Sequence, residues 1–315
     1  MNREADNGNP KRRFPPWLKK RIPAGAEAAT GAEVSRMLRE LGLNTVCSGA
    51  HCPNMAECFG CGTATFLIMG PSCTRACRFC AIDGRPPAPL REDEPEAVAE
   101  AAARLGLQHV VITSVTRDDL ADGGARHFAR TVEAVRRRLP EAAIEVLTPD
   151  FLGDASAIDV VVASGPQVFN HNIETVPRLY PEVRPEADYR RSLDVIRHAK
   201  EESRRRGLET RTKSGLMVGL GEEHGEILGV FKDLLSVGCD ILTIGQYLAP
   251  SADHVPVDRF VAPEEFEELA HEAEAMGFAA VASGPFVRSS YNAGRLLESI
   301  GRPGGKNGQQ ADAKS

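Results

Sequence analysis

The chain has 315 residues, of which 42% are hydrophobic and 26% charged, a composition typical of a soluble globular protein. Its net charge of −6 gives no electrostatic support for general nucleic-acid binding, so no nucleic-acid partner is expected. No apolar stretch reaches the roughly 20 residues of a membrane span, so no membrane association is expected either. With eight cysteines and no visible secretory signal, the chain is predicted to be cytoplasmic, in a reducing compartment.

The N-terminal region divides into two predicted parts. Residues 1–25 are expected to form an extended or disordered arm, in which the basic run Lys11–Arg21 is interpreted as a solvated charge cluster. Apolar residues then recur at helical spacing over Ala28–Leu41, and Gly42 ends this helix. A cysteine-rich loop follows, so residues 26–62 are predicted to be an N-terminal extension.

Residues 63–286 alternate short apolar strands with charged helices. The expected strands are Thr65–Met69, His109–Ser114, Ile144–Leu147, Val168–His171, Ser214–Val218, Ile241–Tyr247 and Ala279–Ser283. The expected helices are Glu94–Leu105, Gly124–Leu139, Tyr189–Arg206, His224–Val237 and Pro263–Met276, and residues 154–163 are interpreted as a helix followed by a short strand. This alternation implies a parallel sheet, and about six units predict an α/β fold, an incomplete (β/α)6-type barrel. Residues 287–300 are predicted to be a C-terminal extension, and the Gly-, Gln- and Lys-rich residues 301–315 a disordered tail.

Polar residues follow several of these strands, at the barrel end where parallel barrels carry their chemistry. Ser114 ends the second strand, Asn172 and Glu174 follow the fourth, and Lys213 opens the fifth, where it is expected to face the barrel mouth. Ligand contact is the favoured interpretation of Asn172 and Glu174, with structural hydrogen bonding as the alternative.

Three further groups of residues have mainly structural interpretations. Asp118 and Asp119 fit a helix cap as well as a functional role. Gly123-Gly124 is predicted to start the next helix, and Cys239 to be a small buried core residue.

The other seven cysteines lie between residues 47 and 80, in two spacings. Cys47, Cys52 and Cys58 form C-x4-C-x5-C, whereas C-x3-C-x2-C consists of Cys73, Cys77 and Cys80, and Cys61 lies between the two triplets. So many thiols in one short stretch are rarely core packing. They are expected to be oxidised, metallated or reactive.

Three chemistries compete for these cysteines. Disulfides suit small secreted domains without a core, and this chain is long enough to need none. A zinc ribbon would pair Cys58-x2-Cys61 with Cys77-x2-Cys80, but it would leave three cysteines unused and place a buried strand between the pairs. An iron–sulfur cubane uses more of them, because the second triplet can hold three irons and leave the fourth open to a small molecule. Nearby side chains can donate to sulfur or ligand, or shield the cluster: Ser72, Thr74, Arg75 and Phe79.

At these residues the chain resembles the radical S-adenosylmethionine superfamily and, within it, the lipoyl synthases. The similarity includes both cysteine triplets and the stretches GTATFLIMG, TSVTRDDLADGGARHF, FNHNIETVPRLYPEVRP, KSGLMVGLGE and VRSSYNAG. It spans Phe14 to Arg295. The chain departs from the family pattern at Cys61, where no cysteine is required, and over Gln246–Phe260, where substrate contacts are expected.

The resemblance implies an enzyme that inserts two sulfur atoms, at C6 and C8, into an octanoyl group attached to a lysine of a lipoyl carrier domain. It implies two [4Fe–4S] clusters and S-adenosylmethionine as cofactors. Cys73, Cys77 and Cys80 would hold the cluster that binds S-adenosylmethionine. The contacts of that ligand would be Ser114, Asn172, Glu174 and Lys213.

By the same resemblance, Cys47, Cys52 and Cys58 would hold an auxiliary cluster that donates the sulfur. The hydroxyl of Ser290 would complete it, with that of Ser289 as the second choice, and Cys61 is not expected to be an essential ligand. The implied partners are octanoylated carrier domains (2-oxoacid dehydrogenase subunits and the glycine cleavage H protein), reduced ferredoxin or flavodoxin, and an iron–sulfur carrier protein.

Two other functions were weighed. A methylthiotransferase is the nearest alternative enzyme, but such enzymes typically add an RNA-binding module, for which this acidic chain shows no extension. A zinc-stabilised binding protein is the alternative outside the enzymes.

Overall fold

The centre of the molecule is one sheet whose strands follow each other in chain order. The computed structural model describes residues 14–19, 25–46, 52, 54–60, 64–82 and 84–301. The strands are β1 (Asn44–Thr45), β2 (Thr65–Ile68), β3 (His109–Ser114), β4 (Ala143–Leu147), β5 (Val168–Asn170), β6 (Arg211–Val218), β7 (Ile241–Gln246) and β8 (Ala280–Gly284). β1 pairs antiparallel with β2, and all later neighbours pair in parallel. Within the described residues β8 does not pair back to β1, so the predicted incomplete barrel is confirmed.

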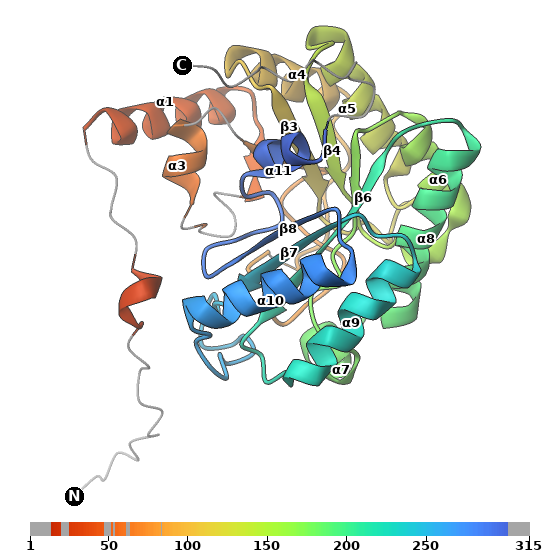
Figure 1. Cartoon of the computed structure of the whole chain (residues 1–315). Helices are drawn as coiled ribbons and strands as arrows, with labels where there is room; N and C mark the ends of the chain where they lie inside the picture. Colours follow the sequence, from red (N-terminus) through yellow and green to blue (C-terminus); the bar gives the residue numbers. More distant parts are fainter. Residues whose placement is uncertain are drawn as a thin grey trace, which may run out of the picture.

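Helices surround the outer face of the curved sheet (Figure 1). The long ones are α4 (Glu94–Arg104), α5 (Ala125–Arg138), α6 (Ala155–Ala163), α8 (Tyr189–Arg205), α9 (His224–Ser236) and α10 (Pro263–Met276). Shorter pieces lie in the loops: η2 (Phe151–Gly153), η3 (Pro177–Leu179) and α7 (Tyr180–Val183). Six strand–helix units followed by β8 therefore agree with the predicted pattern.

Alternate strand residues lie in two different environments, as a period of two requires. The outward side chains are apolar and buried: Ile112 and Ile144 pack with the residues of α4–α6, and Ile244 packs with those of α9 and α10. The inward positions of the same strands include Glu145 and Lys213, which bond to each other. The barrel therefore has an apolar outer layer and a polar interior.

Two extensions complete the fold. The N-terminal one contains α1 (Ala26–Glu40) and α3 (Met55–Gly60), and the C-terminal one contains α11 (Ala293–Ser299). Figure 1 shows α11 close to α3, although the two come from opposite ends of the chain. α11 packs through Leu297 against Ala143 and Val168 at the beginnings of β4 and β5.

The bounds of the main elements lie close to their predictions, and the differences have local causes. The predicted strand within residues 154–163 is wrong: α6 occupies the segment because the side chain of Asp154 caps it, accepting from Ser156 N. Cys58 lies in helix α3 rather than in the expected loop. Within the arm predicted to be extended, η1 (Pro16–Leu18) is a 3-10 helix with Leu18 buried. The predicted tail at 302–315 lies outside the described residues.

Two smaller predictions are confirmed. Gly124 starts α5 with a left-handed φ of 89°, and Cys239 is buried, which raises the pKa of its thiol to about 12. Within the described part of the chain, none of the helices combines the length and the apolar character needed to cross a membrane.

Candidate active site

The second cysteine triplet begins just after β2, at a sharply turned segment. Met69 and Gly70 both have positive φ, 68° and 92°. Met69 N donates to Glu94 Oε2 at 2.8 Å, and its carbonyl accepts from Arg117 Nη1 at 3.2 Å. His127 Nε2 lies 2.7 Å from the same Glu94 oxygen. Such a backbone costs on the order of 1–3 kcal/mol in a residue other than glycine, and these buried partners hold it in place.

The loop that carries the triplet is fixed by loops from other strands. Thr74 donates twice to Thr116 O, from its amide and from its hydroxyl, each at 3.0 Å. Arg78 N donates to Val183 O at 3.0 Å, and Arg78 O accepts from Val255 N at 2.9 Å. These contacts from other segments hold the cysteine loop in place.

The stretch Gln246–Phe260, which departs from the family pattern, is one of these supports. Gln246 Nε2 donates to Arg259 O at 3.1 Å, and Tyr247 Oη donates to Val255 O at 2.6 Å. Val255 in turn donates to the cysteine loop. In this chain the stretch thus packs through its backbone against the loop that carries Cys73, Cys77 and Cys80.

Arg75 supplies the main ionic support of the loop. Its Nε lies 2.7 Å from Asp118 Oδ2 and its Nη2 lies 2.7 Å from Asp150 Oδ1, while Arg191 Nε lies 2.7 Å from the other Asp150 oxygen. The Asp150 side chain is 0% exposed. Burial opposes its ionisation, but the bond and charge of Arg75 outweigh it and hold the pKa of Asp150 well below its usual range. Asp118 is therefore an ion-pair partner of the cluster loop, and Asp119 pairs with Arg117.

The three thiols of this loop are partly buried and close enough to influence one another. Arg75 N and Thr116 N donate to Cys73 Sγ, at 3.4 and 3.3 Å. Burial raises the pKa of Cys77, and it raises that of Cys80 to about 11, with the neighbouring thiols adding to both increases. No three His, Cys, Asp or Glu side chains in the described residues are arranged around a single metal ion. A cubane needs a different arrangement, because each cysteine binds a different iron. Backbone amides that donate to the sulfur atoms are compatible with it.

The polar residues expected to contact S-adenosylmethionine fall into two groups. Ser114 is the last residue of β3, and Glu174 lies in the loop after β5; the buried Ser114 Oγ has no partner in the described structure. Glu174 has a positive φ of 66°, and Asn172 Nδ2 donates to its Oε1 at 3.0 Å. Burial raises the pKa of Glu174, against the opposing charge of Arg184.

Lys213 belongs to the other group, and its expected position at the barrel mouth is wrong. β6 begins at Arg211, so Lys213 lies in its first half, inside the barrel and 1% exposed. Its Nζ donates to Glu145 Oε1 at 2.9 Å. The ammonium is therefore engaged in an internal ion pair.

Sequence reasoning missed Glu145, although a glutamate at the inward position of an apolar strand must find a partner. Glu145 is 1% exposed, and it also accepts from Asn170 Nδ2 at 3.0 Å and lies 3.3 Å from His109 Nε2. Burial alone would raise its pKa, but the charges of Lys213 and His109 lower it to about 2. The barrel interior thus contains a compensated carboxylate.

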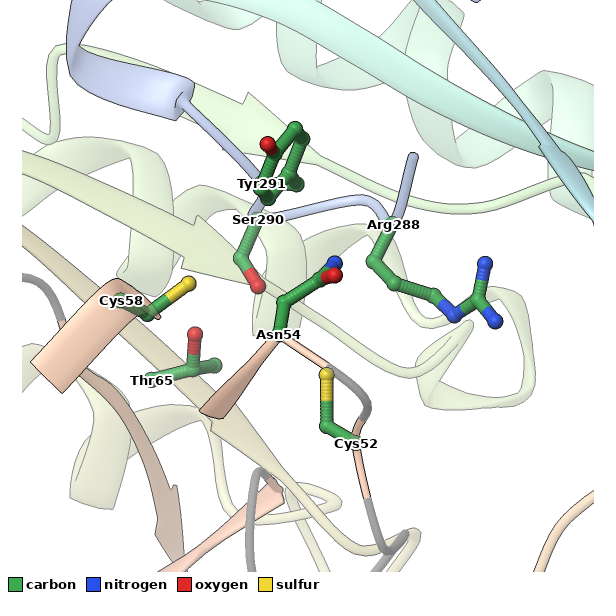
Figure 2. Close-up of a pocket in the computed structure, with 7 residues that line it drawn as sticks. All are labelled: Cys52, Asn54, Cys58, Thr65, Arg288, Ser290 and Tyr291. Carbon is green, nitrogen blue, oxygen red and sulfur yellow. The ribbon is translucent and has the colours of Figure 1, made fainter. Parts of the chain in front are cut away.

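Residues of the first cysteine triplet line a pocket inside the barrel near the beginning of β2 (Figure 2). It encloses about 270 Å³, including the solvent at its mouth, and is lined by Cys52, Asn54, Cys58, Thr65, Arg288, Ser290 and Tyr291. In Figure 2 the Ser290 hydroxyl and the Cys58 thiol point toward the same space. Cys47 and Cys61 lie outside the described residues. The structure therefore brings together two cysteines of the first triplet and the serine predicted to join them.

Two hydrogen bonds tie the N-terminal and C-terminal segments of this pocket together. Asn54 Nδ2 donates to Phe286 O at 2.7 Å, and Tyr291 Oη donates to Glu57 Oε1 at 2.8 Å. Phe286 lies before Ser290 in the chain, and Tyr291 directly follows it. The pocket is thus closed by segments from opposite ends of the sequence.

The two serines of the RSSY segment have different surroundings. Ser289 Oγ accepts from Asn170 Nδ2 and donates to Asn172 Oδ1, each at 2.8 Å. Ser290 lines the cysteine pocket instead. The hydroxyl of Ser289 is therefore engaged with the barrel wall, whereas Ser290 lies in the pocket with Cys52 and Cys58.

Comparison with known proteins decides the family. The radical SAM superfamily matches residues 67–234, and the N-terminal domain of lipoyl synthase matches residues 1–52. The lipoyl synthase of Nitratidesulfovibrio vulgaris (strain Hildenborough) is 54% identical over 288 residues, covering 91% of this chain and 94% of that protein. This chain belongs to the lipoyl synthase family. The lipoyl synthase of Trichlorobacter lovleyi is 56% identical and covers 89% of this chain and 97% of its own.

The predicted enzyme class is confirmed with the family: lipoyl synthases are radical S-adenosylmethionine enzymes that insert sulfur. Their cofactors include a [4Fe–4S] cluster and S-adenosylmethionine, and they act on lipoyl carrier proteins. Solved structures add the fold. The [FeFe]-hydrogenase maturase HydG has a TM-score of 0.55 at 15% identity, covering 68% of this chain and 50% of its own. SuiB from Streptococcus suis, bound to S-adenosylmethionine, has a TM-score of 0.52 at 12% identity, covering 82% and 64%.

Proposed function

We propose that in this lipoyl synthase Cys73, Cys77 and Cys80 hold the [4Fe–4S] cluster and leave one iron open to S-adenosylmethionine. When bound, the pair supplies radical chemistry, which unactivated C–H bonds require and acid–base side chains cannot provide. The chain's own task is to fix the thiols and exclude water. The amide donors at Cys73 and the buried Arg75 pairs suit that task.

The residues around this site have distinct proposed roles. Glu174, held by Asn172, offers a partly buried acceptor for the amino or hydroxyl groups of S-adenosylmethionine. Ser114 offers a buried hydroxyl that has no partner in the described structure. The strained backbone of Glu174 supports a functional role, because such strain persists where surrounding structure enforces it. Lys213 is proposed to act through its ion pair with Glu145 and not by contact with the ligand.

The pocket lined by Cys52, Cys58 and Ser290 is proposed to hold a second [4Fe–4S] cluster. Its proposed ligands are Cys47, Cys52, Cys58 and Ser290. The observation that carries this assignment is the meeting of Ser290 with Cys52 and Cys58 in one pocket. Burial lowers the pKa of the nearby Arg288, and the charge of Cys52 opposes that shift, so an anionic group beside it would be favoured. Thiolate is the usual ligand of such irons, so a serine oxygen would be more easily displaced. This suits a cluster that is the source of the two sulfur atoms inserted at C6 and C8.

The proposed carriers are octanoylated subunits of 2-oxoacid dehydrogenases and the glycine cleavage H protein. The proposed electron donor is reduced ferredoxin or flavodoxin, and an iron–sulfur carrier protein would rebuild the second cluster. The proposed setting is the cytoplasm, because free cysteines of this number persist in a reducing compartment.

Isotope labelling tests the sulfur source. The second cluster is rebuilt with a heavy isotope of sulfide, and the lipoyl product is analysed by mass spectrometry. Both product sulfurs should carry the label, and the amount of product should not exceed the amount of protein unless a cluster carrier is added. Unlabelled product, or many turnovers without a sulfur supply, would contradict the proposal.

A further inference from the structure

The segment that carries the RSSY motif, residues 286–291, runs directly along the inner face of the barrel. This segment is called the tail below. A methyl group at Gly245 would lie 2.2 Å from Val287 O, so a glycine is needed there for the tail backbone to approach β7. On the other side, Asn54 and Tyr291 bond the tail to the N-terminal extension. The tail is therefore enclosed between the barrel wall and α3.

Ser289 connects this tail to two groups of barrel side chains. Asn170 Nδ2 donates both to Ser289 Oγ at 2.8 Å and to Glu145 Oε1 at 3.0 Å. Ser289 Oγ donates to Asn172 Oδ1 at 2.8 Å, and Asn172 Nδ2 donates to Glu174 Oε1 at 3.0 Å. One hydroxyl thus joins the internal ion pair of the barrel to the carboxylate at its mouth.

The partners of Ser289 are themselves fixed, so they define where its hydroxyl can lie. Asn170 is 0% exposed, and its amide is shared with Glu145, which is held in turn by Lys213. A hydroxyl that accepts from one fixed amide and donates to another has a single favourable orientation. The backbone that follows is set as well, because Tyr291 N donates to Arg288 O at 2.8 Å.

We propose that Ser289 is a positioning residue, whose hydroxyl sets the register of the tail so that Ser290 faces the cysteine pocket. The inference rests on the proposed role of Ser290 as a cluster ligand. Without the Ser289 hydroxyl, the tail loses its side-chain bonds to Asn170 and Asn172 and is free to turn Ser290 away. Ser289 acts through its neighbour and does not touch the cluster.

The experiment uses the full chain with Cys73→Ala, Cys77→Ala and Cys80→Ala, reconstituted anaerobically so that iron is bound at the second site only. The rate of iron release to an added chelator is measured for Ser289→Ala, for Ser290→Ala and for both together. Ser289→Ala should release iron roughly tenfold faster, the effect of losing one or two buried hydrogen bonds, and Ser290→Ala should release it at least as fast, because it removes the proposed ligand itself. The double variant should be no faster than Ser290→Ala alone, because the two substitutions remove the same ligand.

Matched controls separate positioning from general loosening. Ser299→Ala removes a hydroxyl elsewhere in the C-terminal extension, bonded to Leu296 O, and should leave the rate unchanged. Ser289→Thr keeps a hydroxyl and should restore slow release. In the iron-free protein, hydrogen exchange at the Tyr291 amide should be faster in Ser289→Ala while the melting temperature stays the same. If Ser289→Ala binds no iron, Asn170→Ala removes a bond of the same hydroxyl and replaces it in the cycle.

Two outcomes would overturn the inference while the proposed function stands: no acceleration in Ser289→Ala, or an acceleration of equal size with and without Ser290. An unchanged rate in Ser290→Ala would instead reject Ser290 as a ligand, and the positioning role with it.

Discussion

The two cysteine sites are stabilised by different kinds of interaction. The site of Cys73, Cys77 and Cys80 lies on one continuous loop and is held by buried charged side chains, above all Arg75 with Asp150. The second is assembled from opposite ends of the chain and is held largely by neutral hydrogen bonds such as those of Asn54 and Ser289. Breaking a buried ion pair costs about 3–5 kcal/mol, whereas a neutral hydrogen bond contributes about 1 kcal/mol. The loop of Cys73, Cys77 and Cys80 should therefore resist opening more strongly than the pocket of Cys52, Cys58 and Ser290.

The largest expected effect comes from removing the site of Cys73, Cys77 and Cys80, which separates the roles of the two sites. Replacing Cys73, Cys77 and Cys80 together with alanine should abolish cleavage of S-adenosylmethionine and leave about half of the iron, because one of the two proposed clusters would remain. Iron analysis and product chromatography check this. Stoichiometric zinc in the unaltered protein, with no iron, would show that the cysteines have another function.

Ser290→Ala should separate the cleavage of S-adenosylmethionine from the formation of the lipoyl product. The Ser290 hydroxyl is the proposed oxygen ligand of the second cluster, so cleavage of S-adenosylmethionine should continue while little or no lipoyl product forms. Both products are measured in the same reaction with an octanoylated carrier domain, and Ser299→Ala is the matched control. Loss of cleavage together with product would mean that the sites are not separate.

The ionic support of the first site should dominate stability. Asp150→Ala leaves Arg75 and Arg191 without their shared buried partner and should lower the free energy of unfolding by about 3–5 kcal/mol, measured by urea denaturation. Asp93→Ala, which breaks an exposed pair with Arg91, should leave it almost unchanged. Similar losses in both variants would remove the contrast between the two kinds of pair.

Acid should destabilise the protein through His171, which lies beside Asp150 behind the cluster loop. Burial, with the charge of Arg184, lowers the pKa of His171 to about 4 from its usual 6.5. The unfolded chain therefore binds the proton first, so stability is complete above pH 6.5 and falls by up to roughly 3 kcal/mol as the pH drops toward 4. His171→Gln should flatten this part of the stability curve, and an unchanged slope would assign it to other groups.

The smallest expected effect concerns Cys61, which the family pattern does not require. Cys61→Ala should keep its iron and its lipoyl product, because the proposed ligands Cys47, Cys52 and Cys58 would already supply three thiolates. Iron content per chain is the measurement, with Cys58→Ala as the variant expected to lose iron. Loss of a whole cluster in Cys61→Ala would change the ligand set of the second site.

The sequence by itself determined the barrel and the first site. The strand His109–Ser114 and the helix Pro263–Met276 agree with the structure at both ends, because hydrophobic period and capping residues act over a few neighbouring positions. The first site was visible for the same reason: Cys73, Cys77 and Cys80 lie together after an apolar strand.

Only the tertiary structure decided the roles that depend on distant segments. It distinguished Ser289 from Ser290, which no local pattern separates, by the direction of each hydroxyl. It placed Lys213 inside the barrel, and it revealed Glu145 on β4 as its partner, across the intervening strand β5. These are long-range pairings of buried polar groups, and their energies depend on which side chains meet inside the fold.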